Sequence, residues 1–368
     1  MRRPITMTET RCAEHGFSLI EIMVGIVIGM IAVLVIYQVY AAAEGIKRNT
    51  TSVGDAQQNG LLSSFMLNVE LANASNGTSY AFKDLAVCNA TGSMANSLRP
   101  IPVLITDGGG AANPDSFVVN YSLAPRIVAT VPFAGSSAPG SDYQVQSPNG
   151  FNAGDLVIAI STTACAISRV TAVNPGPSAA GPTPPADVNG VVTLAHTAET
   201  FDAGAAPAAF DSLLNMGPKG SGQRVAYDVS NNVLRSTALW DDNGAPGANA
   251  PNPIASNIVN MKLVYGIDNG AGGVTWTPAT GQWSSASILA SDSNTFRANV
   301  GKIKAVRIGI VVRGEQWDKT LGDYTWTLFS APVQLSGTVP AAGGGGNYRF
   351  RVYETTIPLR NPIWNPVS

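Results

Sequence analysis

Residues 16–40 read GFSLIEIMVGIVIGMIAVLVIYQVY, and this stretch decides the fold. From Ile22 to Ala43 the sequence holds no charged residue, and Glu21 is the one carboxylate just before this apolar run. As a helix, the run would be about 33 Å long, which matches the hydrocarbon core of a bilayer at about 30 Å. We therefore expect a membrane-spanning helix near the N-terminus.

The helix is expected to continue well past the membrane, because no proline falls between Pro4 and Pro100. We predict one helix over residues 17–74, about 85 Å long, ended by the turn-forming residues 73–77. Residues 17–43 would lie in lipid or in the core of a fibre, and residues 44–74 would be amphipathic. The apolar stripe expected to pack on a globular domain consists of Ile46, Val53, Leu61, Leu62, Phe65 and Val69.

Beyond residue 75 the apolar residues alternate with polar ones, which is typical of half-buried antiparallel strands. The clearest runs are residues 259–267, where Asn260 and Lys262 fall on the polar face, and residues 306–312 and 348–352. Ser230, Asn231 and Asn232 indicate a hairpin between residues 224–228 and 233–239. Further strands are expected at residues 117–121, 156–161, 167–173 and 325–334.

These patterns predict an α+β fold in which the long helix packs on an antiparallel sheet with large loops. Residues 75–368 form the β-rich head, with an insertion at about 108–220. Residues 174–190 are too rich in proline and glycine for regular structure, and residues 343–346 are expected to form a flexible hairpin connection.

Charge gives little sign of a charged partner. The 22 basic and 24 acidic residues leave a formal net charge of -2, and charged residues make up only 12 % of the chain. That is about half the usual share for a soluble domain. Such a balance has no electrostatic footprint for nucleic acid, so no nucleic-acid partner is expected.

Of the three cysteines, Cys12 precedes Gly16, and Cys88 and Cys165 lie in the head. Cleavage after Gly16 would leave an even pair, which favours a disulfide in an oxidising compartment. Two buried free thiols are the alternative. A disulfide closing a loop of this length would contribute about 4 kcal/mol on the chain-entropy model.

Catalytic residues are scarce. His15 precedes Gly16, which leaves His196 as the one histidine of the head, and neither a GxSxG elbow nor an HExxH pattern occurs. Asp241, Asp242 and Asn243 form a weak calcium candidate, since the spaced ligands and distal glutamate of an EF-hand are lacking. We expect no enzyme activity, no cofactor and no metal.

The N-terminus resembles the class III signal of type IV pilins and of type II secretion pseudopilins. The pattern is a short polar leader ending in Gly16, then Phe17, Glu21 and the apolar run. The resemblance implies a leader of residues 1–16, cleavage after Gly16 by a prepilin peptidase, and N-methylation of Phe17. Two other interpretations are an ordinary signal-anchor helix and a secretory signal peptide cleaved near residues 41–43.

The resemblance also implies an assembly role for Glu21. A carboxylate near the membrane core costs about 2.5–3.5 kcal/mol at the helix centre and persists with a partner. In a fibre that partner would be the positive amino terminus of a neighbouring subunit. This pairing would set the register between subunits along the fibre.

Three segments of the C-terminal half resemble the PilW-type minor pilins: residues 262–266 (KLVYG), residues 304–313 (KAVRIGIVVR) and residues 348–361 (YRFRVYETTIPLRN). The resemblance implies a low-abundance subunit that primes pilus assembly and lies at or near the fibre tip. Its partners would be other minor pilins, the major pilin and a large tip adhesin. The protein would be held in the bacterial inner membrane with its head in the periplasm, and later in the extracellular fibre.

Two alternative functions stay open. A minor pseudopilin of a type II secretion system would share the N-terminal signal. An exported adhesin or binding protein would instead be released after a conventional signal peptide.

Overall fold

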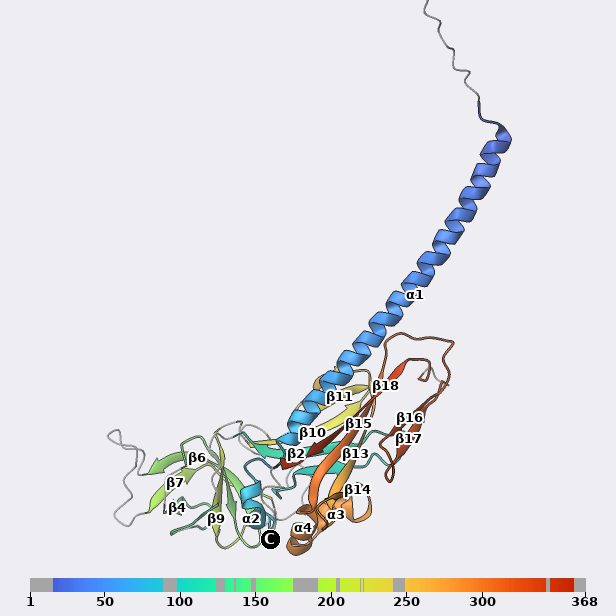
Figure 1. Cartoon of the computed structure of the whole chain (residues 1–368). Helices are drawn as coiled ribbons and strands as arrows, with labels where there is room; N and C mark the ends of the chain where they lie inside the picture. Colours follow the sequence, from blue (N-terminus) through green and yellow to red (C-terminus); the bar gives the residue numbers. More distant parts are fainter. Residues whose placement is uncertain are drawn as a thin grey trace, which may run out of the picture. The chain divides into compact units, whose positions relative to one another are not determined.

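The computed structural model describes residues 16–88, 98–123, 130–135, 137–146, 150–174, 191–202, 206–218, 220, 222–240, 249–341 and 345–360. The chain divides into two compact units, residues 1–52 and 53–368, and each is described by itself. We call the second unit the head. The α+β fold class expected from the sequence is confirmed, with a long N-terminal helix and antiparallel sheets (Figure 1).

Helix α1 runs from Leu19 to Ala72. At about 1.5 Å per residue its 54 residues make it about 81 Å long. It contains an 18-residue window that is long and apolar enough to cross a membrane. After the helix, Ser75 and Gly77 take positive φ values of 61° and 78°, and these left-handed conformations turn the chain away from the helix axis.

Two antiparallel sheets carry most of the head. The five-stranded sheet has the order β1 (Val103–Thr106), β2 (Ser116–Ser122), β10 (Gly222–Ser230), β11 (Val233–Ala238) and β12 (Asn252–Ser256). The four-stranded sheet has the order β14 (Val274–Pro278), β13 (Ile258–Asp268), β15 (Ile303–Arg313) and β18 (Phe350–Pro358). One apolar core joins both sheets to α1, and it includes Leu67, Ile105, Tyr265 and Ile310.

The hairpin between β10 and β11 forms where the sequence predicts it. Ser230 pairs with Val233, and the two residues between them, Asn231 and Asn232, have φ values of 52° and 59°. Positive φ at both positions is the geometry of a two-residue hairpin turn, and asparagine tolerates it better than most residues.

A second hairpin covers the other face of the four-stranded sheet. Its strands are β16 (Tyr324–Leu328) and β17 (Leu335–Val339), and Trp326 and Leu328 pack against Val264 and Val311. The prediction of a single strand over residues 325–334 is therefore wrong at its end, because β16 stops at Leu328. The prediction of a hairpin at residues 343–346 is also wrong, because the strands flanking it, β17 and β18, pair with β16 and β15.

Six further strands close into a small barrel. Their order is β3 (Val131–Pro132), β9 (Ser212–Gly217), β5 (Leu156–Ile160), β6 (Cys165–Asn174), β7 (Val192–His196) and β4 (Tyr143–Val145), and β8 (Thr200–Phe201) also pairs with β6. Phe133, next to β3, bridges Val145 of β4, so the two ends of the sheet meet. The region expected as an insertion, about 108–220, thus contains β2 of the five-stranded sheet and then this barrel.

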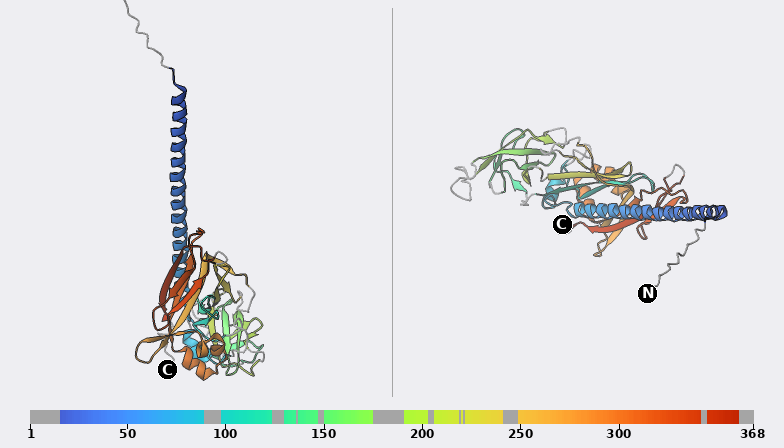
Figure 2. Two further views of the ribbon diagram at one scale, coloured as in Figure 1. Left: turned by 90° about the vertical axis from the view of Figure 1, so that its right-hand side faces the viewer. Right: turned by 90° about the horizontal axis from the view of Figure 1, so that it is seen from above.

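Alternation along β5 shows how the barrel packs. Val157 and Ala159 share a core with Tyr143 and Phe210, residues from other parts of the barrel. The intervening residues of β5, such as Ile158, belong to a different cluster with Leu85 and Trp240. Successive residues of a strand point to opposite faces, so one face of β5 fills the barrel and the other packs on its surroundings in the head. Figure 2 shows the green barrel strands apart from the orange and red strands of the four-stranded sheet.

Cys88 and Cys165 form a disulfide, with their Cα atoms 5.2 Å apart. It links the segment after α2 (Phe82–Leu85) to the first residue of β6. Arg99 extends this link, because its Nε donates to the Cys88 carbonyl oxygen at 2.7 Å and its Nη1 to that of Ser291 at 2.6 Å. Ser291 lies between the short helices α3 (Ser285–Ala290) and α4 (Ser293–Val300), so the disulfide and these helices are tied together.

Several sequence predictions lie outside the described residues. They are the leader residues 1–15 with Cys12 and His15, all of the predicted loop 174–190 except its first residue, the calcium candidate at Asp241, Asp242 and Asn243, and Asn361 of the last PilW-like segment.

Candidate assembly surface

The start of α1 is shaped by Glu21. The Ser18 backbone N–H donates to the Glu21 Oε2 at 3.1 Å, and Ile22 N donates to the Ser18 carbonyl oxygen at 3.2 Å. This is half of a capping box, in which a glutamate three residues into the helix satisfies a free backbone N–H at its start. Within its own chain Glu21 therefore stabilises the first turn of α1. Phe17 precedes the helix and is 84 % exposed.

Inside the head, α1 packs through small side chains. The residues that are buried along this part of the helix are Ala56, Gly60, Ser63, Leu67, Leu71 and, just past its end, Ala74. They recur every three or four residues, so they share one face, which we call the inward face. A Cβ atom at Gly60 would overlap the ring of Tyr353 on β18, so the helix comes very close to the sheet at this point.

Polar contacts fix the rotation of the helix on the head. The Tyr121 hydroxyl of β2 donates to the Glu70 Oε2 at 2.8 Å, and Asn59 Nδ2 donates to the Ser256 Oγ at 3.4 Å. Burial raises the pKa of Tyr121, and the hydrogen bond to Glu70 raises it further, so the hydroxyl remains a donor throughout the physiological range. These contacts hold the inward face toward the sheets.

The opposite side of the same helix is apolar and exposed. We call this the outward face, and its members are Leu61, Leu62, Phe65, Met66 and Val69. Phe65 is 68 % exposed and Leu61 is 54 % exposed. Large apolar side chains that gather on one exposed surface mark interaction sites in soluble domains.

The expected orientation of the helix is therefore wrong. The stripe of Leu61, Leu62, Phe65 and Val69 was predicted to face the globular domain, yet these residues are exposed. The buried residues are instead those of the inward face, its small residues and the two leucines Leu67 and Leu71. The physical reason is distance, because a helix can approach a sheet this closely only through small residues such as Ala56 and Gly60. Hydrophobic periodicity alone assigns these large apolar residues to the core, and so it predicts the wrong face of the helix to be buried.

The other residues considered for chemistry are accounted for by local contacts. His196 sits between two backbone oxygens, with its Nε2 2.9 Å from the Ser141 oxygen and its Nδ1 2.7 Å from the Thr197 oxygen. Its ring stacks on Tyr143. Cys88, Cys165 and Asp202 are close enough to share a metal ion, but both sulfur atoms belong to the disulfide and Asp202 Oδ1 accepts from the Cys165 N–H.

Comparison with known families gives two matches. The family described as Type IV Pilus-assembly protein W matches residues 226–361, a stretch that includes most of β10 and all of β18. The prokaryotic N-terminal methylation motif matches residues 11–37, which include Gly16, Phe17 and Glu21. The expected resemblance to prepilins and to PilW-type proteins is thereby confirmed: the chain carries a prepilin-type methylation motif and a PilW-type region.

Among solved structures, a type IV-like pilin from Thermus thermophilus is similar at 11 % identity. The match covers 57 % of this chain and 86 % of that one, with a TM-score of 0.23. No curated protein matches the chain.

Proposed function

We propose that this protein is a minor pilin that helps to prime assembly of a type IV pilus and is located at or near the fibre tip. The outward face of α1 carries this proposal, together with the methylation motif and the PilW-type region. A helix that packs one face on its own head and exposes large apolar residues on the opposite face is suited to bind other subunits. The protein would wait in the inner membrane, anchored by residues 17–43, and move from there into the fibre.

Processing comes first in this scheme. A prepilin peptidase would cleave between Gly16 and Phe17 and methylate the new amino terminus. The first residue of the mature chain distinguishes the main alternatives. A mature chain that begins at methylated Phe17 supports a pilin, whereas one that begins at Glu44 would mean release after a conventional signal peptide.

Glu21 has two separable roles in this proposal. Its charge would pair with the amino terminus of a neighbouring subunit, while its side chain also caps its own helix through the Ser18 N–H. A carboxylate accepts several hydrogen bonds, so capping leaves capacity for an ammonium group. Glutamine can replace glutamate in a capping box but carries no charge.

The test compares Glu21→Ala with Glu21→Gln. Both variants should be cleaved after Gly16, and both should be missing from sheared fibres, because both lack the charge. Fibre content is measured by immunoblot against the amount in the membrane. Normal incorporation of the glutamine variant with loss of the alanine variant would show that capping, and not pairing, is what assembly requires. Normal incorporation of both would contradict any assembly role of Glu21.

The machine that uses this subunit is identified by deleting its gene. We expect loss of surface pili and of twitching motility, both restored by the wild-type gene. Intact pili with failure of enzyme secretion would instead identify a minor pseudopilin of a type II secretion system. Pull-down from assembled fibres then names the partners, which we expect to be other minor pilins, the major pilin and a large tip adhesin.

A further inference from the structure

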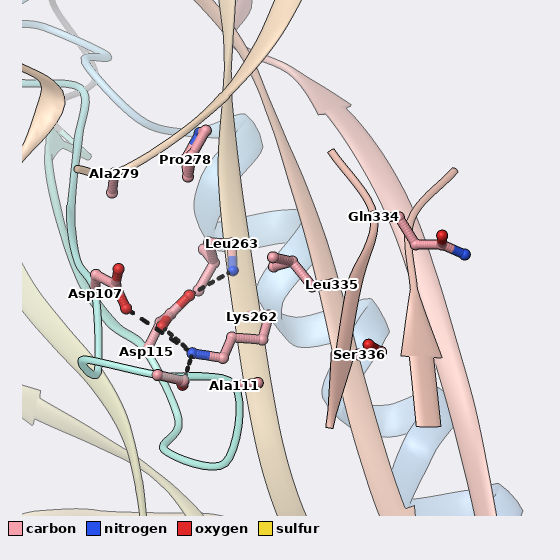
Figure 3. A pocket seen from close by; sticks show the side chains of 11 residues that line it. Asp107, Ala111, Asp115, Lys262, Leu263, Pro278, Ala279, Gln334, Leu335 and Ser336 are labelled. Atoms are coloured by element: carbon pink, nitrogen blue, oxygen red, sulfur yellow. Dashed lines mark hydrogen bonds and ion pairs between the residues drawn. The ribbon is translucent and has the colours of Figure 1, made fainter. Parts of the chain in front are cut away.

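A buried lysine and a buried aspartate meet where the two sheets of the head come together (Figure 3). Lys262 lies on β13, and Asp115 ends the loop between β1 and β2. Both side chains are about 95 % buried, with exposures of 4 % and 5 %, and Lys262 Nζ is 2.7 Å from Asp115 Oδ1. Lys262 was expected on a solvent-facing side of its strand, and that expectation is wrong because this loop covers it.

The loop is held on β13 by one backbone and one side-chain hydrogen bond. The Asp115 N–H donates to the Met261 carbonyl oxygen at 2.7 Å, and Asn260 Nδ2 donates to that of Ala111 at 2.9 Å. The neighbouring strand β14 ends at Pro278, opposite Val264, so the loop occupies the edge of β13 that β14 leaves open. The fold therefore fixes both partners, the Lys262 amine on β13 and the Asp115 carboxyl on the loop.

The Asp115 carboxyl is polarised from two directions. The Leu263 N–H donates to its Oδ2 at 2.9 Å, and the Gly108 N–H donates to its Oδ1 at 3.0 Å. Each carboxyl oxygen thus accepts one fixed backbone donor, so the oxygen that becomes the oxyanion of a tetrahedral intermediate keeps one N–H to stabilise its charge. Burial also raises the pKa of Asp115, against hydrogen bonds from Lys262, Gly108 and Leu263 that lower it, which favours the neutral acid as an electrophile.

A second carboxylate stands beside the pair. Asp107 Oδ1 lies 4.0 Å from Lys262 Nζ, and its side chain is 36 % exposed. The same residues line a pocket of about 340 Å³, which is also lined by Gln334, Leu335 and Ser336 around the start of β17. The partly exposed Asp107 can carry a proton between reacting groups, and the pocket gives a released water molecule a way out.

We propose that Lys262 and Asp115 are joined in the mature protein by an intramolecular isopeptide bond. A proton passes from the ammonium to the carboxylate within the pair, and the neutral Nζ attacks Cγ of Asp115. The new N–C bond gives a tetrahedral intermediate in which the protonated Oδ1 is the hydroxyl and the negative charge lies on Oδ2, where the Leu263 N–H donates. Asp107 takes the second proton from nitrogen and passes it to the departing hydroxyl, the C–O bond breaks, and one water leaves. The reaction needs no oxidant, reductant or cofactor.

Such a bond would link the two sheets of the head covalently. The loop before β2 belongs to the five-stranded sheet and Lys262 to the four-stranded one, so force that pulls the sheets apart would load an amide bond. A non-covalent ion pair at the same place would break when the sheets separate. The proposal concerns the head alone and goes beyond the role in fibre assembly.

The test is peptide mass analysis of the full-length wild-type protein purified from membranes, after reduction of the disulfide and digestion with trypsin. The bond predicts one fused product, in which residues 84–126 are joined to residues 236–297 with the mass of one water missing and no cleavage after Lys262. Fragmentation must place the link at Asp115 and Lys262. Separate peptides with cleavage after Lys262 would overturn the proposal.

Variants test the chemistry. Lys262→Arg keeps the charge but cannot form the amide, so it should give no fused product. Asp107→Asn should slow bond formation by about a hundredfold or more, as loss of a general acid–base group does, so that freshly synthesised protein is mostly unlinked. Asp268→Asn removes a carboxylate from the half-buried last position of the same strand and should leave the link complete. Unchanged linking in Asp107→Asn would overturn the role given to Asp107, and the wild-type measurement stands even where a variant fails to fold.

Discussion

The inward and outward faces of α1 in the head, both drawn from residues 53–74, depart from the usual pattern of an amphipathic helix, because large apolar residues lie on both faces. The inward face offers Ala56, Gly60 and Ser63 to the sheets, and the outward face presents Leu61 and Phe65 to solvent. A surface helix normally turns its large apolar residues to the core. On the inward face Leu67 and Leu71 fill the core, and Ala56, Gly60 and Ser63 allow the helix to approach the sheets closely. The large residues of the outward face stay available to other subunits.

The largest effect is expected where the inward face does hold a large side chain. Leu67 is fully buried in the core that joins α1 to both sheets, so Leu67→Ala should lower the free energy of unfolding by about 2–5 kcal/mol. Denaturant unfolding of the detergent-solubilised protein, followed by tryptophan fluorescence, measures this. The matched control is Leu61→Ala on the outward face, which should change the same quantity by about 0.5 kcal/mol or less. Equal losses of unfolding free energy in the two variants would show that both faces contribute equally to the stability of the head, which contradicts the assignment of the two faces.

Substitutions of two glycines test how closely α1 approaches the sheet, and their smaller effects on the free energy of unfolding should have opposite signs. Gly60→Ala places a Cβ against the Tyr353 ring and should destabilise the head by about 1–3 kcal/mol. At Gly54 a Cβ would meet no atom within 4 Å, so Gly54→Ala should stabilise the helix by up to about 1 kcal/mol. The same unfolding measurement applies to both. Stabilisation by Gly60→Ala would show that the helix does not need glycine to reach the sheet.

Local patterns in the sequence predict much of this fold. The absence of proline and the apolar run predict α1, and alternation predicts β13 and β15 to within a few residues. β2 and β5 also form where strands are expected at residues 117–121 and 156–161. The turn at Asn231 and Asn232 is predicted because two-residue hairpins need positive φ at both positions. The methylation motif predicts Gly16, Phe17 and Glu21 as candidate residues because all three lie in one short, contiguous stretch of sequence.

What could not be predicted depends on residues far apart in the chain. Lys262 is buried by a loop about 150 residues earlier, as the separation of 147 residues from Asp115 shows, and alternation along β13 contains no trace of it. The barrel closes through Phe133 and Val145, which no local pattern pairs. The hydrogen bond from the Ser18 N–H to Glu21 is different, because it is local. The spacing of Ser18 and Glu21 is that of a capping box, and this pattern could have predicted the contact.

The smallest effect on stability is expected at Phe65, in the middle of the outward face. Phe65→Ser should leave the free energy of unfolding within about 0.5 kcal/mol of the wild type, because the side chain is 68 % exposed and contributes little to the core. Phe65→Leu is the matched control, since it shortens the side chain but keeps it apolar. A large loss of stability in Phe65→Ser would mean that this face supports the head itself.

The claim that the outward face binds other subunits is tested most directly by the amount of Phe65→Ser protein in sheared fibres, at membrane levels equal to the wild type. If Phe65 is buried against a neighbouring subunit, Phe65→Ser should weaken that contact by about 1.4 kcal/mol or more. This predicts a drop in fibre content of about tenfold or more. Phe65→Leu should retain most of its incorporation. Wild-type amounts of the serine variant in fibres would contradict the account.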